Sequence, residues 1–461
     1  MAKGWATSGT DLHLELAGSR GRAGLEQALR AAVQSGRLGP GTRLPSSRVL
    51  AVDLGIARNT IVDAYGQLVA EGWLTSVTGS GTRVADRVVA AVPPTPPVPD
   101  ARVIRHDLRA GHPDLSTFPG TAWLGAARRA LHAAPPDAFG YGDPRGRPEL
   151  RRALAGYLSR ARGVRTDPER IVVCAGFTPA LSLVCEVLAG RGTSTLAVEE
   201  YGHDNHRRLV RARGLRVREV PVDGYGAVVE GFGDAGGALL TPAHQFPLGI
   251  AMTARRRTRA VEWAAASGAL LVEDDYDGEF RYDRQAIGAL QGLAPESVIY
   301  AGTASKTLAP GVRLGWLVLP GYLVDDVAAA KSLGDRQVAT LDQLTLAELI
   351  GSGGYDRHVR RCRLLYRRRR DRLVALVRER APRVRITGVA AGMHVVLELP
   401  AGVDEDDVVR RAADRGLALD GLGHYGPRNG RRPALVIGYG TPPPSAFTTA
   451  TARLAAVLAS L

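Results

Sequence analysis

The chain has 461 residues, with 60 Lys and Arg against 46 Asp and Glu, which gives a formal net charge of +14. This length predicts two or three domains, and a composition of 45% hydrophobic and 23% charged residues argues against disorder of the whole chain. No apolar run is long enough to span a bilayer and no signal-peptide pattern is present, so we expect a cytoplasmic protein. Cys174, Cys185 and Cys362 have no paired spacing, which excludes a disulfide scaffold and provides no metal motif.

A proline-rich segment, residues 92–100 (VPPTPPVPD), divides the chain. Proline fixes φ and removes a backbone donor, so this segment is expected to be an extended spacer. We therefore predict an N-terminal domain over residues 1–88, a linker over 89–103 and a C-terminal domain over 104–461. The C-terminal domain would divide into a large part, about 150–322, and a small part, about 323–461.

The N-terminal region has the pattern of three helices and a hairpin. Apolar residues at helical spacing predict helices over 24–34, 47–54 and 58–71. The run Gly79-Ser80-Gly81 between residues 73–77 and 82–84 predicts a tight hairpin. This order indicates a winged helix-turn-helix, whose second helix enters the major groove of DNA. There Arg and Asn read the edges of guanine and adenine, and hydroxyl groups suit phosphates.

Residues 43–74, RLPSSRVLAVDLGIARNTIVDAYGQLVAEGWL, closely resemble the GntR-type winged helix. The resemblance implies binding to double-stranded operator DNA. It assigns the contacts to five residues of the helix-turn-helix and two of the wing tip: Ser46, Arg48, Arg58, Asn59 and Thr60, with Thr78 and Gly79.

The C-terminal region alternates short apolar runs with helical stretches. This alternation predicts an α/β fold with a mostly parallel, doubly wound sheet. From about residue 323, a long helical stretch followed by two or three strands predicts a smaller α+β part. The predicted strands of the large sheet are 171–174, 195–198, 215–220, 238–240, 269–272, 298–300 and 314–318.

Two motifs in this region carry candidate chemistry. Lys306 lies within AGTASKTLAPGVRLGW, and a desolvated lysine is the residue type that forms a Schiff base. Asp274 follows an apolar strand, where a buried carboxylate can pair with a pyridinium nitrogen. With FGYGDPRGRPELRRALAGYL, TPAHQFPLG and RAGHPDLSTFP, these motifs resemble the fold-type I aminotransferases over about residues 105–440.

That resemblance implies pyridoxal 5'-phosphate as cofactor. Lys306 would form the internal aldimine, Asp274 would keep the pyridine nitrogen protonated and Tyr276 would bond the ring hydroxyl. Tyr141 would reach the cofactor of the neighbouring subunit, which implies a homodimer. The phosphate would be held by Gly176, Phe177, Thr178, Thr303, Ser305 and Arg313.

The sequence departs from the aminotransferase pattern at four positions. Two glutamines usual after Gly176 are replaced by Thr178 and Pro179. His203 takes the place of the tyrosine that stacks on the ring and is expected to titrate near neutral pH, with Tyr201 as the alternative stacker. Val436 takes the place of the arginine that clamps a substrate carboxylate, which puts efficient transamination in doubt. The nearby arginines that would substitute for it are Arg428, Arg431 and Arg432.

A GntR-type head joined to an aminotransferase-like domain is the layout of the MocR-type transcription regulators. The resemblance implies a head-to-tail homodimer that senses pyridoxal phosphate, or an amine or amino acid, through Lys306. The genes it controls would belong to vitamin B6 or amino-acid metabolism. The alternative is a working aminotransferase with an accessory DNA-binding head.

The basic charge is not concentrated in the N-terminal region. Residues 1–90 hold 10 basic and 7 acidic residues, a net +3, whereas residues 356–385 hold 13 arginines and 3 acids, a net +10. We predict a helix there with Val359, Leu365, Leu373 and Leu376 in one buried stripe. Its arginine face is either a solvated surface or a second, sequence-independent DNA contact.

Overall fold

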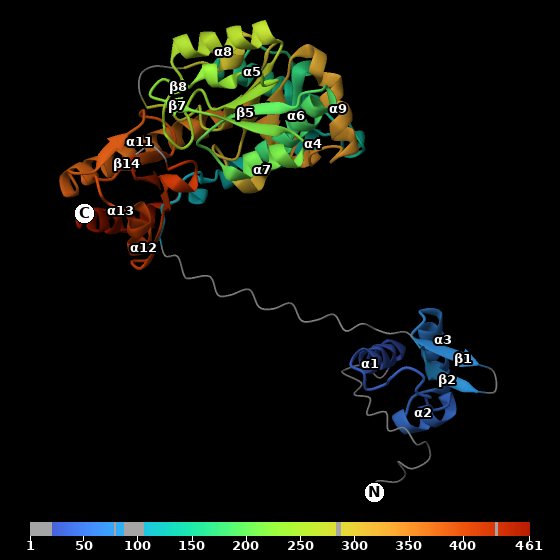
Figure 1. The fold of residues 1–461 in the computed structure, drawn as a ribbon. Helices are drawn as coiled ribbons and strands as arrows, with labels where there is room; N and C mark the ends of the chain where they lie inside the picture. The colour runs from blue at the N-terminus through green and yellow to red at the C-terminus, as the bar shows by residue number, and fades with distance from the viewer. Residues whose placement is uncertain (1–20, 78–79, 87–105, 283–286, 429–431) are drawn as a thin grey trace. The chain divides into compact units, whose positions relative to one another are not determined.

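The computed structural model describes residues 21–77, 80–86, 106–282, 287–428 and 432–461 (Figure 1). The chain forms two compact units, Met1–Ala101 and Arg102–Leu461, and each is considered by itself. The predicted linker and the predicted wing-tip residues Thr78 and Gly79 lie outside the described residues. No helix of the described ranges has both the length and the apolarity needed to cross a bilayer.

The N-terminal unit is a helix-turn-helix with a small wing. Helices α1 (Arg22–Gln34), α2 (Ser47–Leu54) and α3 (Arg58–Ala70) are followed by β1 (Leu74–Val77) and β2 (Gly81–Val84), which pair antiparallel. The side chains at helical spacing close one core, in which Leu25, Leu50, Ile61 and Leu68 are buried. The Ser46 hydroxyl accepts a hydrogen bond from the Val49 amide and caps the start of α2.

A seven-stranded sheet forms the centre of the C-terminal unit, in the order β4-β12-β11-β10-β9-β5-β6. Strand β12 is antiparallel to both neighbours and the other strands are parallel. All seven predicted strands are present. Their bounds are β4 Ile171–Cys174, β5 Thr195–Glu199, β6 Arg216–Val220, β9 Gly237–Leu240, β10 Leu270–Asp275, β11 Val298–Thr303 and β12 Gly315–Val318.

Alternate residues of these strands enter different cores because successive side chains of a strand point to opposite faces. Val172 and Val272 pack with α6 (Phe177–Gly190), α7 (Asp204–Ala212) and α9 (Val324–Leu333). Val173 and Leu271 belong to the opposite face. That face is covered by α4 (Gly120–Ala133), α5 (Pro148–Arg162), α8 (Ala254–Ser267) and α10 (Thr340–Gly351). Burial on both faces explains why the inner strands are largely apolar, whereas the edge strand β6 (RVREV) is mostly exposed and charged.

A second, four-stranded sheet has the order β13-β14-β17-β16 and is antiparallel. Its strands are Arg385–Thr387, His394–Glu398, Ala434–Gly438 and Asp420–Gly421, in that order. It packs with α11 (Gly354–Arg380), α12 (Glu405–Ala413) and α13 (Pro444–Leu458), which are orange to red in Figure 1. Short pairs β3–β15 (His106–Asp107, Leu417–Ala418) and β7–β8 (Val222–Asp223, Gly226–Ala227) complete the strands. The boundary between the large and small parts was predicted near residue 323. Helices α9 and α10, which follow that residue, still pack on the large sheet, and the chain passes to the smaller sheet along α11.

Helix α11 carries the arginine-rich run. Val359 and Leu373 are buried as predicted, and Leu365 and Leu376 are half-buried. Arg369 is also buried, and its guanidinium lies 2.6 Å from the buried carboxylate of Asp114. The arginines of this helix therefore belong to two classes, one structural and one exposed. The exposed ones are Arg357, Arg360, Arg361, Arg367, Arg368, Arg372, Arg378 and Arg380.

Candidate functional site

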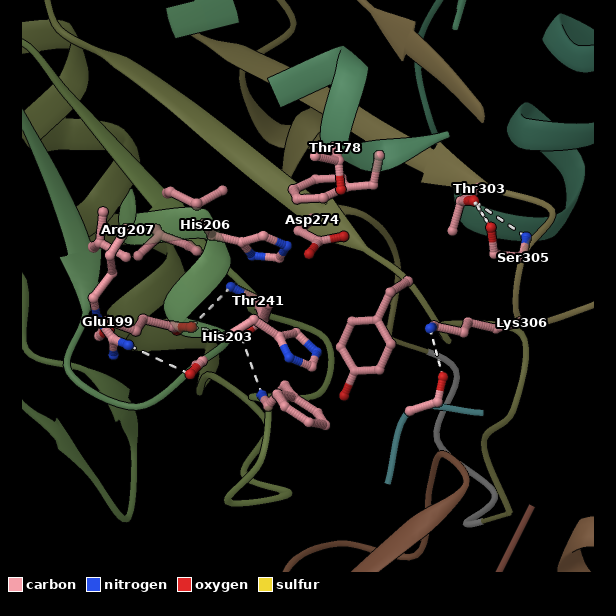
Figure 2. A pocket seen from close by; sticks show the side chains of 18 of the residues that line it. Thr178, Glu199, His203, His206, Arg207, Thr241, Asp274, Thr303, Ser305 and Lys306 are labelled. Carbon is pink, nitrogen blue, oxygen red and sulfur yellow. Dashed lines mark hydrogen bonds between the residues drawn. The ribbon is translucent and has the colours of Figure 1, made fainter. Parts of the chain in front are cut away.

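A cavity of about 250 Å³ lies at the carboxyl ends of β5, β9, β10 and β11, beside the start of α6. The edge at the carboxyl ends of parallel strands is where open α/β sheets bind ligands. Figure 2 shows Lys306, Ser305 and Thr303 on one side of the cavity, Glu199 and Arg207 on the other, and Asp274 between them. Nine of the eleven residues predicted to hold the cofactor line it: Phe177, Thr178, His203, Asp274, Tyr276, Thr303, Ser305, Lys306 and Arg313.

Lys306 lies in the loop that follows β11, and its amine donates a hydrogen bond of 2.6 Å to the carbonyl of Gly111. Burial lowers the pKa of this amine, and the nearby carboxylates of Asp274 and Asp277 only partly offset the effect. A lowered pKa leaves more of the amine unprotonated, which is the form that attacks a carbonyl carbon.

The acidic residues at the end of β10, Glu273, Asp274 and Asp275, point alternately to the two faces of the sheet. Asp275 faces α5, where Arg162 lies 2.6 Å from its carboxylate, and Glu273 accepts the backbone amides of Leu290 and Gln291. Asp274 points to the opposite face and into the cavity. Its Oδ1 is buried without a hydrogen-bond partner, and burial raises its pKa well above the usual value. An unpaired buried carboxyl needs a ligand donor, and a pyridinium N–H fits that need.

An anion cradle lies at the start of α6. Gly176 precedes the helix with φ 99°, and a Cβ there would come within 3.4 Å of the Arg313 guanidinium. The Thr303 hydroxyl donates to Ser305 Oγ at 2.9 Å, so the two hydroxyls lie side by side in the cavity. Helix-start amides, a guanidinium and hydroxyl groups together suit a phosphate.

His203 and Tyr201 both line the cavity. The His203 ring stacks on Phe246, with centroids 4.3 Å apart and planes at 19°. Although His203 is exposed as a residue, loss of solvent around its ring lowers its pKa to about 3, below the near-neutral value expected from the sequence. The Tyr201 hydroxyl donates to the carbonyl of Pro427, which ties this ring to the wall of the cavity.

Several groups at the cavity had no role in the sequence-based prediction. Glu199 accepts hydrogen bonds from Thr241 and Gln245, and burial raises its pKa to about 7. His206 is half-buried, and loss of solvent with the nearby charge of Lys306 lowers its pKa to about 4. The quoted run TPAHQFPLG already held His244 and Phe246, but no sequence pattern indicated what either of them contacts.

Other predicted residues lie away from the cavity. Tyr141 is 85% exposed, and the guanidinium of Arg336 lies 4.6 Å from its ring centroid. Val436 is fully buried in β17, Arg428 pairs with Asp406 at the surface, Arg432 is exposed, and Arg431 is outside the described residues. In the part of the chain that the structure describes, the arginines lining the cavity are Arg207 and Arg313. The Arg207 guanidinium donates to the main-chain carbonyls of Glu199 and Glu200.

The predicted DNA-contacting residues of the head lie at the starts of α2 and α3. Arg58 and Asn59 are the first two residues of α3 and are exposed, as are Ser46 and Arg48 at the start of α2. Thr60 is half-buried. Exposed polar side chains at the start of the second helix have the placement that base reading in a major groove requires.

Comparisons with known proteins match both units. Residues 22–84 match the bacterial regulatory proteins of the gntR family, and residues 106–423 match the class I and II aminotransferases. The pyridoxine biosynthesis transcriptional regulator PdxR of Corynebacterium glutamicum is 34% identical over 90% of this chain and 91% of its own length. The probable rhizopine catabolism regulatory protein MocR of Rhizobium meliloti is 34% identical over 84% of this chain and 83% of its own.

Solved structures of aminotransferases share the fold of the C-terminal unit. An archaeal alanine:glyoxylate aminotransferase has a TM-score of 0.70 at 26% identity, over 78% of this chain and 92% of its own. The kynurenine aminotransferase of Pyrococcus horikoshii has a TM-score of 0.69 at 25% identity, with the same coverage of both chains. The C-terminal unit therefore has the fold-type I aminotransferase fold.

Proposed function

The chain belongs to the MocR-type transcription regulators, which join a GntR-type head to an aminotransferase-like domain, and we propose that its C-terminal unit binds pyridoxal phosphate as a sensing group. The observation that carries the proposal is that a half-buried amine, Lys306, and a buried carboxyl without a hydrogen-bond partner on Oδ1, Asp274, line one cavity. The anion cradle at the start of α6 and Arg313 supplies a site for the phosphate.

Each group of the site has a defined task in this proposal. Pyridoxal phosphate supplies an aldehyde on an electron-withdrawing ring, which reacts reversibly with amines. Lys306 would hold the aldehyde carbon, Asp274 would accept the N–H of the pyridinium, and the His203 ring would cover one face. Tyr276 would donate to the ring oxygen. Gly176, Phe177, Thr178, Thr303, Ser305 and Arg313 hold the phosphate.

The effector is pyridoxal phosphate itself or a small amine that displaces Lys306. Val436 carries no charge, and both terminal nitrogens of Arg207 donate to main-chain carbonyls, which leaves only its Nε without a hydrogen-bond partner. This arrangement favours the cofactor or an amine without an α-carboxylate. The two regulators are named for pyridoxine biosynthesis and for probable control of rhizopine catabolism, and the proposed targets here are genes of vitamin B6 or amino-acid metabolism. An effector shifts DNA binding only through its different affinity for the two states of the protein.

We also propose a head-to-tail homodimer, in which Tyr141 approaches the cofactor of the partner subunit. Its 85% exposure leaves the ring available for such a contact. Cross-linking or sedimentation of the full chain tests the homodimer, and a monomer at micromolar concentration would contradict it.

Borohydride trapping tests the cofactor site with little ambiguity, because the chain has only three lysines, Lys3, Lys306 and Lys331. Lys331 is fully buried and bonded to Asp335, so it is not free to react. We expect reduction with labelled cofactor to mark the Lys306 peptide, and Lys306→Ala to abolish the label. Lys3→Arg is the control that keeps it. A label that persists in Lys306→Ala would place the site elsewhere.

A footprint on the upstream DNA, with and without pyridoxal phosphate, tests the regulatory role. Arg58→Ala should weaken operator binding roughly 5- to 150-fold, the value of one bidentate base contact, and leave cofactor trapping unchanged. Arg37→Ala removes another exposed arginine of the head as a control. Turnover of an amino acid with a keto acid at rates of about 1–1000 s⁻¹ would instead favour the aminotransferase alternative.

A further inference from the structure

A buried histidine–aspartate pair lies behind Tyr276, outside the set of residues assigned above. His244 Nδ1 is 2.8 Å from Asp277 Oδ2, and both side chains are about 3% exposed. The Tyr276 hydroxyl is 3.1 Å from the same Nδ1 and 3.0 Å from the His244 carbonyl. His244 therefore lies within hydrogen-bonding distance of both Asp277 and Tyr276, a side chain of the cavity.

The donors and acceptors of this chain can be assigned from their chemistry. An ionised Asp277 only accepts, so His244 Nδ1 carries the proton and donates it. Nδ1 then has no free lone pair, and the Tyr276 hydroxyl donates to the His244 carbonyl. The phenol oxygen keeps its lone pairs, and its proton can turn to a stronger acceptor that enters the cavity.

Packing holds the pair from the side of the smaller sheet. Gly392 has φ 71°, and a Cβ there would collide with His244 Cε1 and lie 2.5 Å from Asp277 Oδ2. The His394 ring of β14 lies 5.0 Å from the His244 ring, and its Nε2 donates to the Pro247 carbonyl at 2.9 Å. The histidine has little freedom to rotate, as a group that positions another side chain requires.

His244, Asp277 and His394 also have ligating atoms within 4.8 Å of one another, as in a metal site. Two observations favour hydrogen bonding instead. The contact of 2.8 Å is a normal N–H···O distance, and His394 already uses Nε2 on a carbonyl.

We propose that Asp277 and His244 form a positioning pair that holds the Tyr276 hydroxyl against the cofactor's ring oxygen and thereby sets the pH at which the bound cofactor changes its protonation. This inference rests on the proposed function. A phenol that donates to an ionised ring oxygen stabilises that ion, whereas an unshielded Asp277 carboxylate destabilises it. Asp277 interacts with both the Tyr276 hydroxyl and His244 Nδ1, and the proton that His244 donates partly neutralises the carboxylate, which favours the first effect.

Other titratable or charged groups that face the cavity are the same in every variant, so they do not account for differences between variants. They are Asp274, Glu199, Lys306, His112, His203, His206, Arg207 and Arg313, and of these Glu199 has a pKa of about 7. His203 and His206 stay neutral above about pH 4 because burial lowers their pKa values to about 3 and about 4. None of these residues is changed in the experiment below.

The test is a spectrophotometric pH titration of the cofactor bound to the full chain. Without His244, the Tyr276 hydroxyl can turn to Asp277 and away from the ring oxygen. The pH midpoint of the cofactor's spectral transition should therefore rise by about one pH unit in His244→Leu, as it should in Tyr276→Phe. In His244→Asn the amide nitrogen takes the place of Nδ1, so the midpoint should return to near the wild-type value. Asp277→Asn removes the negative charge and should lower the midpoint.

The possible outcomes separate the two proposals. Wild-type protein that shows no cofactor absorbance would refute the proposed function itself. Cofactor bound with the same midpoint in wild type and His244→Leu, while Tyr276→Phe shifts, would overturn the positioning pair. Equal shifts in His244→Leu and His244→Asn, or one equivalent of divalent metal lost only in His244→Leu, would also overturn it. Operator binding by the head and the melting temperature report whether each variant is folded.

Discussion

At the scale of single residues, the partners of each buried carboxyl separate structural acids from candidate functional ones. Asp275 has Arg162 and Tyr300, and Glu199 has Thr241 and Gln245, whereas Asp274 Oδ1 has no partner. A buried polar group without a partner is costly, so a protein retains one chiefly where a ligand will satisfy it. The same acidic residue type at neighbouring positions therefore has different roles.

Asp274→Asn should separate stability from cofactor binding. The unliganded variant should be at least as stable as wild type, since the substitution removes an unpaired buried acid. Affinity for pyridoxal phosphate should fall about 10- to 100-fold, the value of one charge-assisted hydrogen bond. Thermal melting with and without cofactor measures both effects. An unliganded variant that melts well below wild type would contradict the assignment.

Glu199→Gln should change how stability depends on pH. Burial raises the folded-state pKa of Glu199 to about 7 from the usual 4.5, so the folded state favours the protonated acid. Its contribution is therefore present below about pH 4.5 and is lost as pH rises towards 7. Glutamine still accepts the Thr241 and Gln245 hydrogen bonds but carries no charge. At pH 7.5 the unliganded variant should exceed wild type by up to roughly 3 kcal/mol, and by much less at pH 5. Urea unfolding at the two pH values measures the free energy of unfolding of both proteins. The same difference between variant and wild type at both pH values would refute the prediction.

At the scale of elements, helix α11 joins the two sheets and also carries much of the positive charge. The buried ion pair of Arg369 with Asp114 fixes the helix against the segment before α4. Arg369→Ala leaves Asp114 buried without its partner and should cost about 3–5 kcal/mol of unfolding free energy. Arg368→Ala, one residue away and exposed, should cost less than about 0.5 kcal/mol. If urea unfolding showed equal losses of unfolding free energy in Arg369→Ala and Arg368→Ala, the ion pair would not stabilise the fold.

Much of the architecture could be predicted because its signals are local. Most strands of the large sheet contain short apolar runs, and the helix-turn-helix has its apolar residues at helical spacing. The burial of Arg369, the opposite orientations of Asp274 and Asp275 and the contacts of His244 could not be predicted in this way. Each depends on a partner far along the chain, such as Asp114 or Arg162, and residue type alone does not distinguish a paired arginine from a solvated one.

At the scale of the whole molecule, the exposed arginines of α11 are the candidate for a second DNA contact. Arg360, Arg367 and Arg368 are exposed, whereas Arg369 must be left unchanged because it is structural. Each phosphate neutralised on B-DNA contributes about −0.9 to the slope of log K against log salt. Changing all three to Gln should therefore reduce the slope by up to about 3 if they touch the backbone. The matched control changes Arg152, Arg208 and Arg255, exposed residues of α5, α7 and α8, and removes the same charge.

A specific contact predicts that only the α11 variant has a smaller salt slope, whereas equal reductions in both variants would show a general effect of net charge. An unchanged slope in both would leave the α11 arginines as a solvated surface, and operator binding would then depend on the head alone.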